Sequence, residues 1–455
     1  CQAPFPRNGS GTFLGPKEID LVGRPTHGLV WLARMVVREL QITFWLLVAS
    51  ISFPYFWASR GTLRGALGAS VALLFRRLGA TFIKIGQIIS TRPDIFSPDF
   101  LAPLVELQDR VPPFSYDDAR AVLEEEFGRP LGELFSDFSI TPVASASVAQ
   151  VHRAVLRGAA PSGLVVAVKI RRPGIVRRAV LDEAILRAGA RLLALVPTAA
   201  LVSPVESVKH FCHAVNLQLD FRIEAENNRR FRVNFGDDPN VAFPALVESL
   251  CSDRVLTMEF VEGVKDGELD AIGCDRQLLA RKGIEIICRM IYHHGFVHAD
   301  LHPANILYSK ENRVTLIDLG LVAELDADAR NVMARLNLYM LTGMGAELAR
   351  MIFDESPVKD VRDYASFERD VVAFVARVHG RALGELQITV LIGELFNLLR
   401  RHRIHADATF TVVNIAMMVA EGLGRKLDPG LNLSVEALPF LQSALGFDAP
   451  SAGAL

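Results

Sequence analysis

The residues best suited to catalysis lie in two short segments of the C-terminal half of the chain. The first, His298-Ala-Asp300-Leu-His-Pro-Ala-Asn305, holds an Asp-x4-Asn pair, and Asp318-Leu-Gly320 follows it after a candidate hairpin. Phosphoryl transfer needs a carboxylate beside the attacking oxygen and oxygen ligands that hold Mg²⁺ against the phosphates. We therefore expect Asp300 to orient or deprotonate the nucleophile, and Asn305 and Asp318 to bind the metal ion.

A lysine on a buried strand is the second requirement of such a site. Val166-Ala-Val-Lys169 predicts an apolar strand with one lysine, whose ammonium can reach phosphate oxygens while its neighbours pack the sheet. A lone strand lysine is more often a solvated edge residue, so its significance depends on its place before the catalytic segments. Glu224, on an expected helix, is the candidate to pair with Lys169 and fix its position.

The segment before this strand would cover the phosphates. It contains no Gly-x-Gly-x-x-Gly pattern, but its small residues still let the backbone approach phosphate oxygens, and its serine hydroxyls add donors. An ordinary turn between strands is the alternative. The candidate nucleotide-binding residues are Val143, Ala144, Ser145, Ala146, Ser147, Val148, Ala149, Gln150, Val151 and Lys169, with Glu259 and Val261 of an expected hinge, Met258–Val261, that would offer backbone groups to adenine.

Two hairpins and several helices must position these residues. Ser147–Leu156 and Leu164–Ile170 are short runs rich in Val and Ala, as in an antiparallel hairpin, and Asn305–Tyr308 with Val314–Ile317 predict a second hairpin. Arg254–Val261 reads as a further strand. Helical periodicity covers about 63–127, 175–195, 205–231 and most of the chain after the second hairpin.

Composition narrows the class of protein. With 455 residues, 50% of them apolar, the chain can bury sizeable cores. Its 49 Lys and Arg nearly balance 51 Asp and Glu, and the net charge of -2 lacks the basic surplus of a nucleic-acid-binding domain. The five cysteines are scattered and include no Cys-x-x-Cys pair, which indicates a reduced, cytoplasmic protein with free thiols.

One apolar stretch raises the question of a membrane. Leu40–Ser59 contains no charged residue and is just long enough to cross a bilayer, although Pro54 and several polar residues interrupt it. Two interpretations stay open: a helix that spans the membrane, or an apolar helix that lies on its surface or packs on the main domain. In either case we expect membrane association.

Several segments together resemble the UbiB/AarF/ADCK family of atypical, protein-kinase-like kinases. The resemblance runs from about Gly79 to Asp428, and no ordinary protein kinase has its signature KxGQ segment. The matching segments are Phe82-Ile-Lys84-Ile-Gly86-Gln87, Leu107–Pro113, the alanine-rich loop that ends in Ala149-Gln-Val-His152, Val-Ala-Val-Lys169, the His298–Asn305 loop and Asp318.

The resemblance implies an α+β, bilobal protein-kinase-like fold, with an added N-terminal helical KxGQ segment and a helical C-terminal extension. It further implies binding of ATP and Mg²⁺, a gate formed by Lys84 and Gln87, and a role in isoprenoid lipid or quinone metabolism at membranes. A nucleotide, a membrane lipid or quinone precursor, and biosynthetic enzymes are the implied partners. We expect four parts: residues 1–62 (leader and apolar helix), 63–135 (gate segment), 136–263 (N-lobe) and 264–455 (C-lobe and extension).

Three positions depart from the family pattern. Gln218-Leu-Asp220 replaces a Glu-x-Asp pattern, so one carboxylate that could hold Lys84 or a metal is missing. Leu319 stands at a packing position where the metal-binding Asp-Phe-Gly has phenylalanine. Ser145 replaces an alanine of some branches of the family, which leaves the preference between ATP and ADP open.

Other interpretations compete with an ATP-dependent enzyme. A pseudokinase scaffold would bind nucleotide and recruit biosynthetic enzymes with little turnover. A small-molecule phosphotransferase of the aminoglycoside type shares the His-x-Asp loop, but it does not explain the KxGQ segment. A zinc site would need His294, His298 and His302 to share one helix face, whereas Pro303 indicates a loop, in which such histidines are usually structural.

Overall fold

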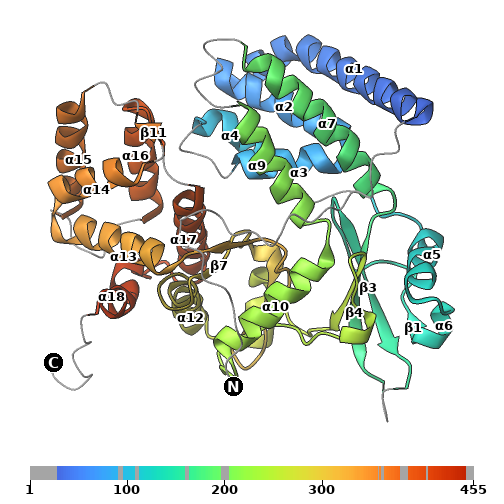
Figure 1. Ribbon diagram of the computed structural model, residues 1–455. Coiled ribbons are helices and arrows are strands. Elements are labelled where there is room, and N and C mark those ends of the chain that lie inside the picture. The colour runs from blue at the N-terminus through green and yellow to red at the C-terminus, as the bar shows by residue number, and fades with distance from the viewer. Residues whose placement is uncertain are drawn as a thin grey trace.

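The computed structural model describes residues 28–90, 96–107, 112–158, 163–195, 204–356, 358–359, 363–379, 388–405 and 408–446. The expected leader, residues 1–27, and residues 108–111 of the KxGQ-like segment lie outside these ranges. The described chain has two lobes and an N-terminal layer of helices (Figure 1), which confirms the predicted α+β, kinase-like fold. The boundaries of the four expected parts stay predictions.

The N-lobe is built on an antiparallel sheet in the order β1-β3-β4-β6, with β2 paired to β3. Its β3–β4 hairpin confirms the first predicted hairpin. Val166, Val168 and Ile170 alternate along β4 and are fully buried in one core cluster with residues of α5 and α6, so Lys169 lies on the opposite face. The elements are β1 (Phe135–Phe138), β2 (Ala144–Ser145), β3 (Ala149–Leu156), β4 (Val165–Arg171), β6 (Val255–Glu259), α5 (Tyr116–Phe127) and α6 (Leu131–Leu134).

The helices on the lysine-bearing side are α7 (Ile175–Leu193), α9 (Pro204–Leu217) and α10 (Phe221–Phe235). The prediction of helix across 205–231 was therefore incomplete, because the chain breaks at residues 218–220. Asp220 is the reason for the new start, since its carboxylate accepts a hydrogen bond from the backbone N–H of Arg222 and caps α10. The break turns α10 so that its first turn carries Glu224 to the sheet.

The C-lobe packs helices around two small sheets. β8 and β9 form the second predicted hairpin, which is thereby confirmed, and β5 pairs with β9 while β7 pairs with β10. The strands are β5 (Val241–Ala242), β7 (Phe296–His298), β8 (Ile306–Tyr308), β9 (Val314–Leu316), β10 (Val322–Glu324), and β11 (Val358–Lys359) paired with β12 (Ile404–His405).

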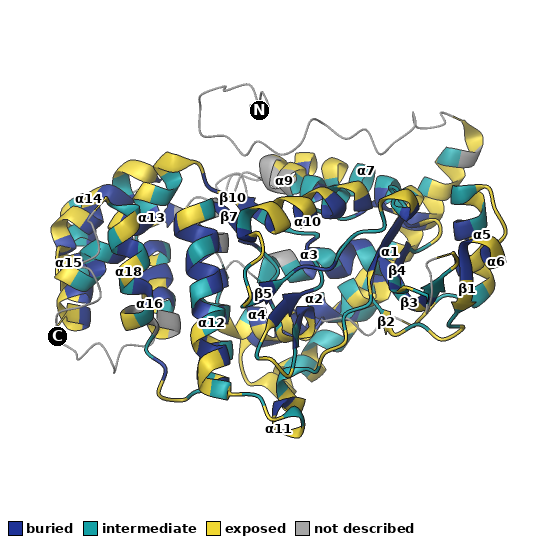
Figure 2. Cartoon of the chain, turned by 90° about the horizontal axis from the view of Figure 1, so that it is seen from below, coloured by how far each residue is buried: buried dark blue, intermediate teal, exposed yellow. Residues whose placement is uncertain are grey.

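The helices of this lobe bury one face and expose the other (Figure 2). α12, α17 and α18 enclose the core beneath the hairpin, and α13 to α16 enclose a second core. The helices are α11 (Leu269–Ile272), α12 (Arg276–Cys288), α13 (Ala327–Thr342), α14 (Gly345–Glu355), α15 (Tyr364–His379), α16 (Ile388–Arg401), α17 (Ala408–Leu427) and α18 (Leu433–Ala444), with 3-10 turns at Glu248–Leu250, Asp266–Glu268 and Pro303–Asn305 and a π-helix at Arg289–His294.

The N-terminal helical layer consists of α1 (Leu29–Arg60), α2 (Leu63–Leu78), α3 (Ala80–Ser90) and α4 (Pro98–Val105), beside α7 and α9 (Figure 1). α1 extends well before the predicted apolar stretch at residues 40–59 and accommodates Pro54. A buried ion pair fixes α1 to α7, because Arg38 Nε lies 2.6 Å from Asp182 Oδ1. The same guanidinium donates to the carbonyl oxygen of Leu78 at 2.8 Å.

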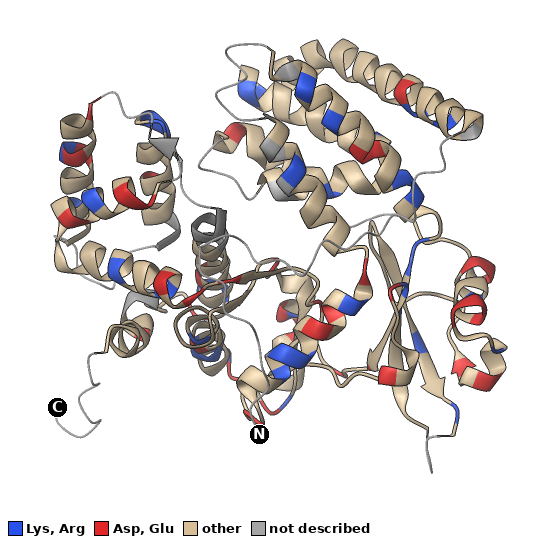
Figure 3. Cartoon of the chain, in the orientation of Figure 1, with Lys and Arg blue, Asp and Glu red and all other residues tan. Residues whose placement is uncertain are grey.

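The outer face of α1 is apolar. Among the described residues, Trp31–Arg60 is the one helix long and apolar enough to cross a membrane by length and composition. Figure 3 shows few charges along it. Its large apolar side chains with high exposure are Leu29, Leu32, Val36, Val37, Leu40, Phe44, Leu46, Leu47, Ile51, Tyr55 and Trp57.

Close packing of α2 on α4 generates a testable prediction. A Cβ at Gly68 would lie 2.2 Å from the carbonyl oxygen of Phe100, a backbone atom that cannot rotate away. Gly68→Ala should therefore lower the free energy of unfolding by about 2 kcal/mol, measured by chemical denaturation. The control is Gly189→Ala on α7, where nothing lies within 4 Å of the new methyl group. It should gain up to about 1 kcal/mol from helix propensity. Equal effects of the two changes would contradict the packing argument.

Candidate active site

A buried ammonium joins the two lobes at the centre of the site. Lys169 Nζ donates to both carboxylate oxygens of Glu224, at 2.8 Å each, and lies 3.3 Å from Asp318 Oδ2. Glu224 comes from the first turn of α10, and Asp318 follows β9 in the C-lobe. The structure thus brings the predicted partners Lys169 and Glu224 together and joins them to the predicted metal ligand.

The three groups differ in their electrostatic environment. Burial raises the pKa of Glu224 to about 7, and the charge of Asp318 adds to this increase while Lys169 opposes it. Burial would also raise the pKa of Asp318, but the positive charges of Lys169 and Lys84 lower it far below its usual range. For Lys169 the two carboxylates outweigh burial, which alone would lower its pKa, and raise it above its ordinary value. Near neutral pH, Glu224 is therefore the group that exchanges a proton, while Lys169 and Asp318 stay charged.

A neutral histidine fixes the candidate catalytic loop, His298–Asn305. His298 is 1% exposed, and its Nδ1 accepts a hydrogen bond from the backbone N–H of Asp300 at 3.1 Å. Its Nε2 therefore carries the proton and donates to the carbonyl oxygen of Asp318 at 2.6 Å. Burial lowers the pKa of His298, which keeps the ring uncharged. Asn305 Nδ2 donates to the carbonyl oxygen of Asp300 at 3.2 Å and closes the loop.

Asn305 and Asp318 fit a magnesium ion. They lie close together because the β8–β9 pairing extends to a hydrogen bond of 3.1 Å from the N–H of Ile317 to the carbonyl oxygen of Asn305. In the described residues, no cluster of three or more His, Cys, Asp or Glu is arranged to hold a metal on its own. Two protein oxygen ligands are nevertheless what Mg²⁺ uses in nucleotide sites, where phosphate and water oxygens complete the coordination.

The phosphate-covering segment forms a short hairpin with its tip at Ala146–Val148. Ala144 pairs with Val151 and Ser145 with Gln150, and the N–H of Ala146 donates to the carbonyl oxygen of Ala149 at 2.8 Å. Lys169 lies opposite Val151 on the neighbouring strand. The segment Val143–Val151 is therefore adjacent to the lysine, as a phosphate cover must be.

Within this segment, the side chain of Gln150 is turned toward protein. Its Oε1 accepts from the N–H of Phe114 at 3.0 Å, and its Nε2 lies 2.8 Å from His152 Nε2. His152 Nδ1 in turn lies 2.8 Å from the carbonyl oxygen of Ser139. Gln150 can therefore offer a nucleotide only its backbone.

The expected hinge follows β6. The N–H of Glu259 donates to the carbonyl oxygen of Ala245 at 2.7 Å, and its carboxylate accepts from the N–H of Ala245 at 3.2 Å. The N–H of Phe260 donates to Val165 at 3.1 Å. Because the N–H of Glu259 is occupied, Val261 is the better placed of the two predicted hinge residues to contact an adenine.

The gate segment approaches the site through α3. The charge of Lys84 lies close enough to Asp318 to lower its pKa, and Gln87 is half-buried one turn further along the helix. Gly86 permits close packing of this helix, since a Cβ there would lie 2.3 Å from Leu107 Cδ1 and 3.1 Å from Phe75 Cδ2. The charge of Lys84 therefore acts on the predicted metal ligand.

Sequence reasoning missed Asn227. Its Nδ2 donates to the carbonyl oxygen of Leu319 at 2.8 Å, one turn along α10 from Glu224. The i,i+3 spacing from Glu224 was the available signal. Leu319 itself is 2% exposed, in agreement with a packing role. Asp220 caps α10 and pairs with Arg222 at 2.5 Å.

The three histidines considered for zinc lie in different elements. His294 ends the π-helix and packs on Phe235 with 4.9 Å between the ring centroids, and His298 lies on β7. His302 Nδ1 accepts from the N–H of Ala304 at 3.2 Å and caps the 3-10 turn of the loop. They do not share a helix face.

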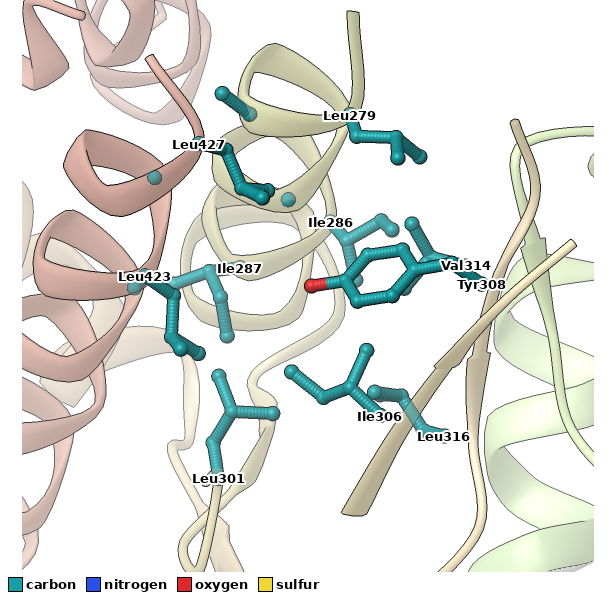
Figure 4. Close-up of a pocket in the computed structure, with 14 residues that line it drawn as sticks. Leu279, Ile286, Ile287, Leu301, Ile306, Tyr308, Val314, Leu316, Leu423 and Leu427 are labelled. Carbon is teal, nitrogen blue, oxygen red and sulfur yellow. The ribbon is translucent and has the colours of Figure 1, made fainter. Parts of the chain in front are cut away.

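A small apolar cavity of about 40 Å³ lies behind the catalytic loop, between α12, α17 and the β8–β9 hairpin. Figure 4 shows that Leu301 and Ile306 line it beside Leu423 and Ile287. Leu301 and Ile306 are the chain neighbours of Asp300 and Asn305. Leu301 and Ile306 therefore pack the His298–Asn305 loop against the apolar core of the C-lobe.

Comparison with known proteins shows which families the chain is similar to. Residues 106–351 match the ABC1 atypical kinase-like domain, and residues 371–432 match the UbiB helical domain. A protein of Shewanella halifaxensis named probable protein kinase UbiB is 31% identical over 398 residues, which cover 86% of this chain and 72% of that protein. A protein of the same name from Marinobacter nauticus is 33% identical over 407 residues, with 88% and 72% covered.

One solved structure has a similar fold. The complex of Rv3197 with erythromycin from Mycobacterium tuberculosis superposes with a TM-score of 0.56 at 24% sequence identity, covering 80% of this chain and 92% of that one. This likeness concerns the fold.

The buried ion pair predicts a stability effect. Lys169→Met leaves the carboxylate of Glu224, 6% exposed, without its ammonium and should lower the free energy of unfolding by about 3 kcal/mol. The double variant Lys169→Met/Glu224→Met should recover most of that loss, because it also removes the buried carboxyl group of Glu224, while Asp318 keeps the nearby charge of Lys84. Urea denaturation of both variants measures the effect. A single variant as stable as the wild type would contradict the pairing.

The raised pKa of Glu224 predicts a pH dependence. Its folded-state pKa of about 7 lies above the ordinary value of 4.5, so the folded protein holds a proton that the unfolded chain has lost between these pH values. The contribution of Glu224 to stability therefore falls as the pH rises from 4.5 to 7. Asp318 acts in the opposite sense at lower pH, because its folded-state pKa is depressed.

The measurement is the thermal midpoint across that pH range for the wild type and for Glu224→Gln. The wild type should lose stability relative to the variant as the pH rises. Parallel curves would show that Glu224 does not titrate in this window.

Proposed function

Because the chain belongs to the ABC1 family of atypical kinase-like proteins, with a UbiB helical domain, we propose that it binds Mg²⁺-ATP between its lobes and hydrolyses it or transfers its γ-phosphoryl group. We further propose that this activity supports isoprenoid lipid or quinone metabolism, of the ubiquinone type, on the cytoplasmic side of a membrane. The observation that carries the proposal is the contact of Lys169 with Glu224 of the N-lobe and Asp318 of the C-lobe.

The residues divide the chemistry between them. Lys169, held by Glu224, would bind phosphate oxygens, and the Val143–Val151 hairpin would cover them with backbone N–H groups. Asn305 and Asp318 would hold Mg²⁺, whose charge stabilises the phosphate oxygens as the terminal bond breaks. Asp300, positioned by His298 and Asn305, would orient or deprotonate the attacking hydroxyl or water.

The gate segment limits the choice of acceptor. The charge of Lys84 on α3 acts on Asp318, so this helix would narrow the approach to the predicted metal ligand. A small or lipid-borne acceptor, or water, suits such a site better than a folded protein.

The outer face of α1 supports the proposed membrane location. Monomeric proteins in water rarely expose a continuous apolar surface of this kind. The ion pair of Arg38 with Asp182 keeps the inner face of α1 on the domain, which favours a helix lying along the bilayer surface over one that spans it. The described cysteines, Cys212, Cys251, Cys274 and Cys288, are free, as suits the reduced cytoplasm.

Phosphate release from Mg²⁺-ATP tests the proposal, measured with and without liposomes that contain anionic lipid. Asp318→Asn removes one metal-binding oxygen and the negative charge, and should lower kcat by at least about 100-fold, as loss of a transition-state electrostatic contact does. Asp328→Asn, an exposed aspartate on α13, is the matched control and should turn over like the wild type.

Two other outcomes would change the conclusion. If the wild type binds nucleotide but releases phosphate no faster than Asp318→Asn, the protein is a nucleotide-binding pseudokinase scaffold. If it binds no nucleotide, the proposed function is wrong.

A further inference from the structure

Residues Pro112–Phe114, which precede α5 in the gate segment, are held to the phosphate hairpin by two side chains. The first is Gln150 on β3, which matches both backbone groups of Phe114: its Oε1 accepts from the N–H at 3.0 Å, and its Nε2 donates to the carbonyl oxygen at 3.4 Å. Because Gln150 is fully buried, this contact fixes Phe114 to the strand that leads away from the tip.

The second side chain is Arg172, which directly follows β4. Its Nη2 donates to the carbonyl oxygen of Pro112 at 3.1 Å and to that of Ala146, in the hairpin tip, also at 3.1 Å. One nitrogen therefore bridges the gate segment and the phosphate cover. The guanidinium also lies over the ring of Phe114, 5.3 Å from its centroid, and the backbone N–H of Arg172 donates to Val148 at 2.8 Å.

These contacts are specific to a guanidinium. Nη2 reaches Ser145 Oγ at 3.4 Å as well, so a single planar group serves three acceptors and an aromatic face. The Nε of Arg172 is buried without a hydrogen-bond partner among the described residues, a cost that the bridging contacts offset. The hairpin tip lacks the glycines of a usual phosphate loop, and these external contacts add to the hydrogen bonds within the hairpin.

We propose that Arg172 is a positioning residue that latches the tip of the phosphate-covering hairpin, Ala146–Val148, to Pro112–Phe114, so that the tip and this short segment move together. The latch then holds the tip over the phosphates of a bound nucleotide. The effect on nucleotide binding rests on the proposed function, whereas the coupling of the two segments does not.

Hydrogen exchange of the full-length protein without nucleotide tests the coupling. Pro112 and Pro113 carry no amide proton, so the first segment is followed at the amides of Phe114 and Ser115. Arg172→Gln should speed exchange at these two amides and in 144–149, and leave exchange in the C-lobe as in the wild type. Arg120→Gln is the matched control, since this exposed arginine on α5 pairs with Asp117 at 3.3 Å near the same segment. Faster exchange in only one of the two segments, or in neither, would overturn the latch.

Steady-state kinetics test the positioning role. Losing one charge-assisted hydrogen bond should raise KM for Mg²⁺-ATP about tenfold in Arg172→Gln, with kcat changed less than about twofold. Coupled exchange with an unchanged KM and an unchanged equilibrium affinity for ATP would reject the positioning role. If the wild type neither binds nor hydrolyses ATP, the proposed function fails, and hydrogen exchange still decides whether the latch exists.

Discussion

The structure depends on keeping one ammonium out of water. Lys169 is nearly buried, and a charge in that position is tolerated only when carboxylates surround it. Its two partners come from different lobes, Glu224 from α10 and Asp318 from the segment after β9. The sheet, α10 and the β8–β9 hairpin must therefore meet at this point. Two further hydrogen bonds fix the segment around Asp318. Asn227 donates to the carbonyl oxygen of Leu319, and His298 donates to that of Asp318.

The charge balance extends this constraint to the gate. Two carboxylates face one ammonium at the centre, and Lys84 on α3 supplies a second positive charge near Asp318. Lys84 thus provides at Asp318 part of the charge that a metal ion would provide there. Because α3 packs tightly at Gly86, the position of this charge is set by the packing of the helical layer. The charge that α3 carries therefore contributes to the electrostatics around Asp318.

Local spacing explains what the sequence could predict. Asp300, Asn305 and Asp318 belong to one loop and hairpin, and alternation along β4 separates Lys169 from the core positions beside it. Contacts between distant segments leave no such pattern. Arg38 and Asp182 are 144 residues apart, and Gln150 lies 36 residues from Phe114. For the same reason the sequence gives no sign that the Gln150 side chain bonds the backbone of Phe114. The break before α10 was missed because the cap at Asp220 outweighs a periodicity that continues across it.

The packing of α1 on the helical layer bears on whether this helix spans a membrane or lies on its surface. Ile42 and Trp45 pack with Leu78, Phe82 and Ile85, so the inner face of α1 covers the same helix that carries Lys84. Withdrawing α1 into a bilayer as a spanning helix would strip that cover and leave Asp182, which is fully buried, without Arg38. A buried carboxylate without its partner is strongly destabilising. Keeping α1 in place while its apolar side contacts lipid avoids that cost, and it preserves the packing of α1 on Phe82 and Ile85 of α3.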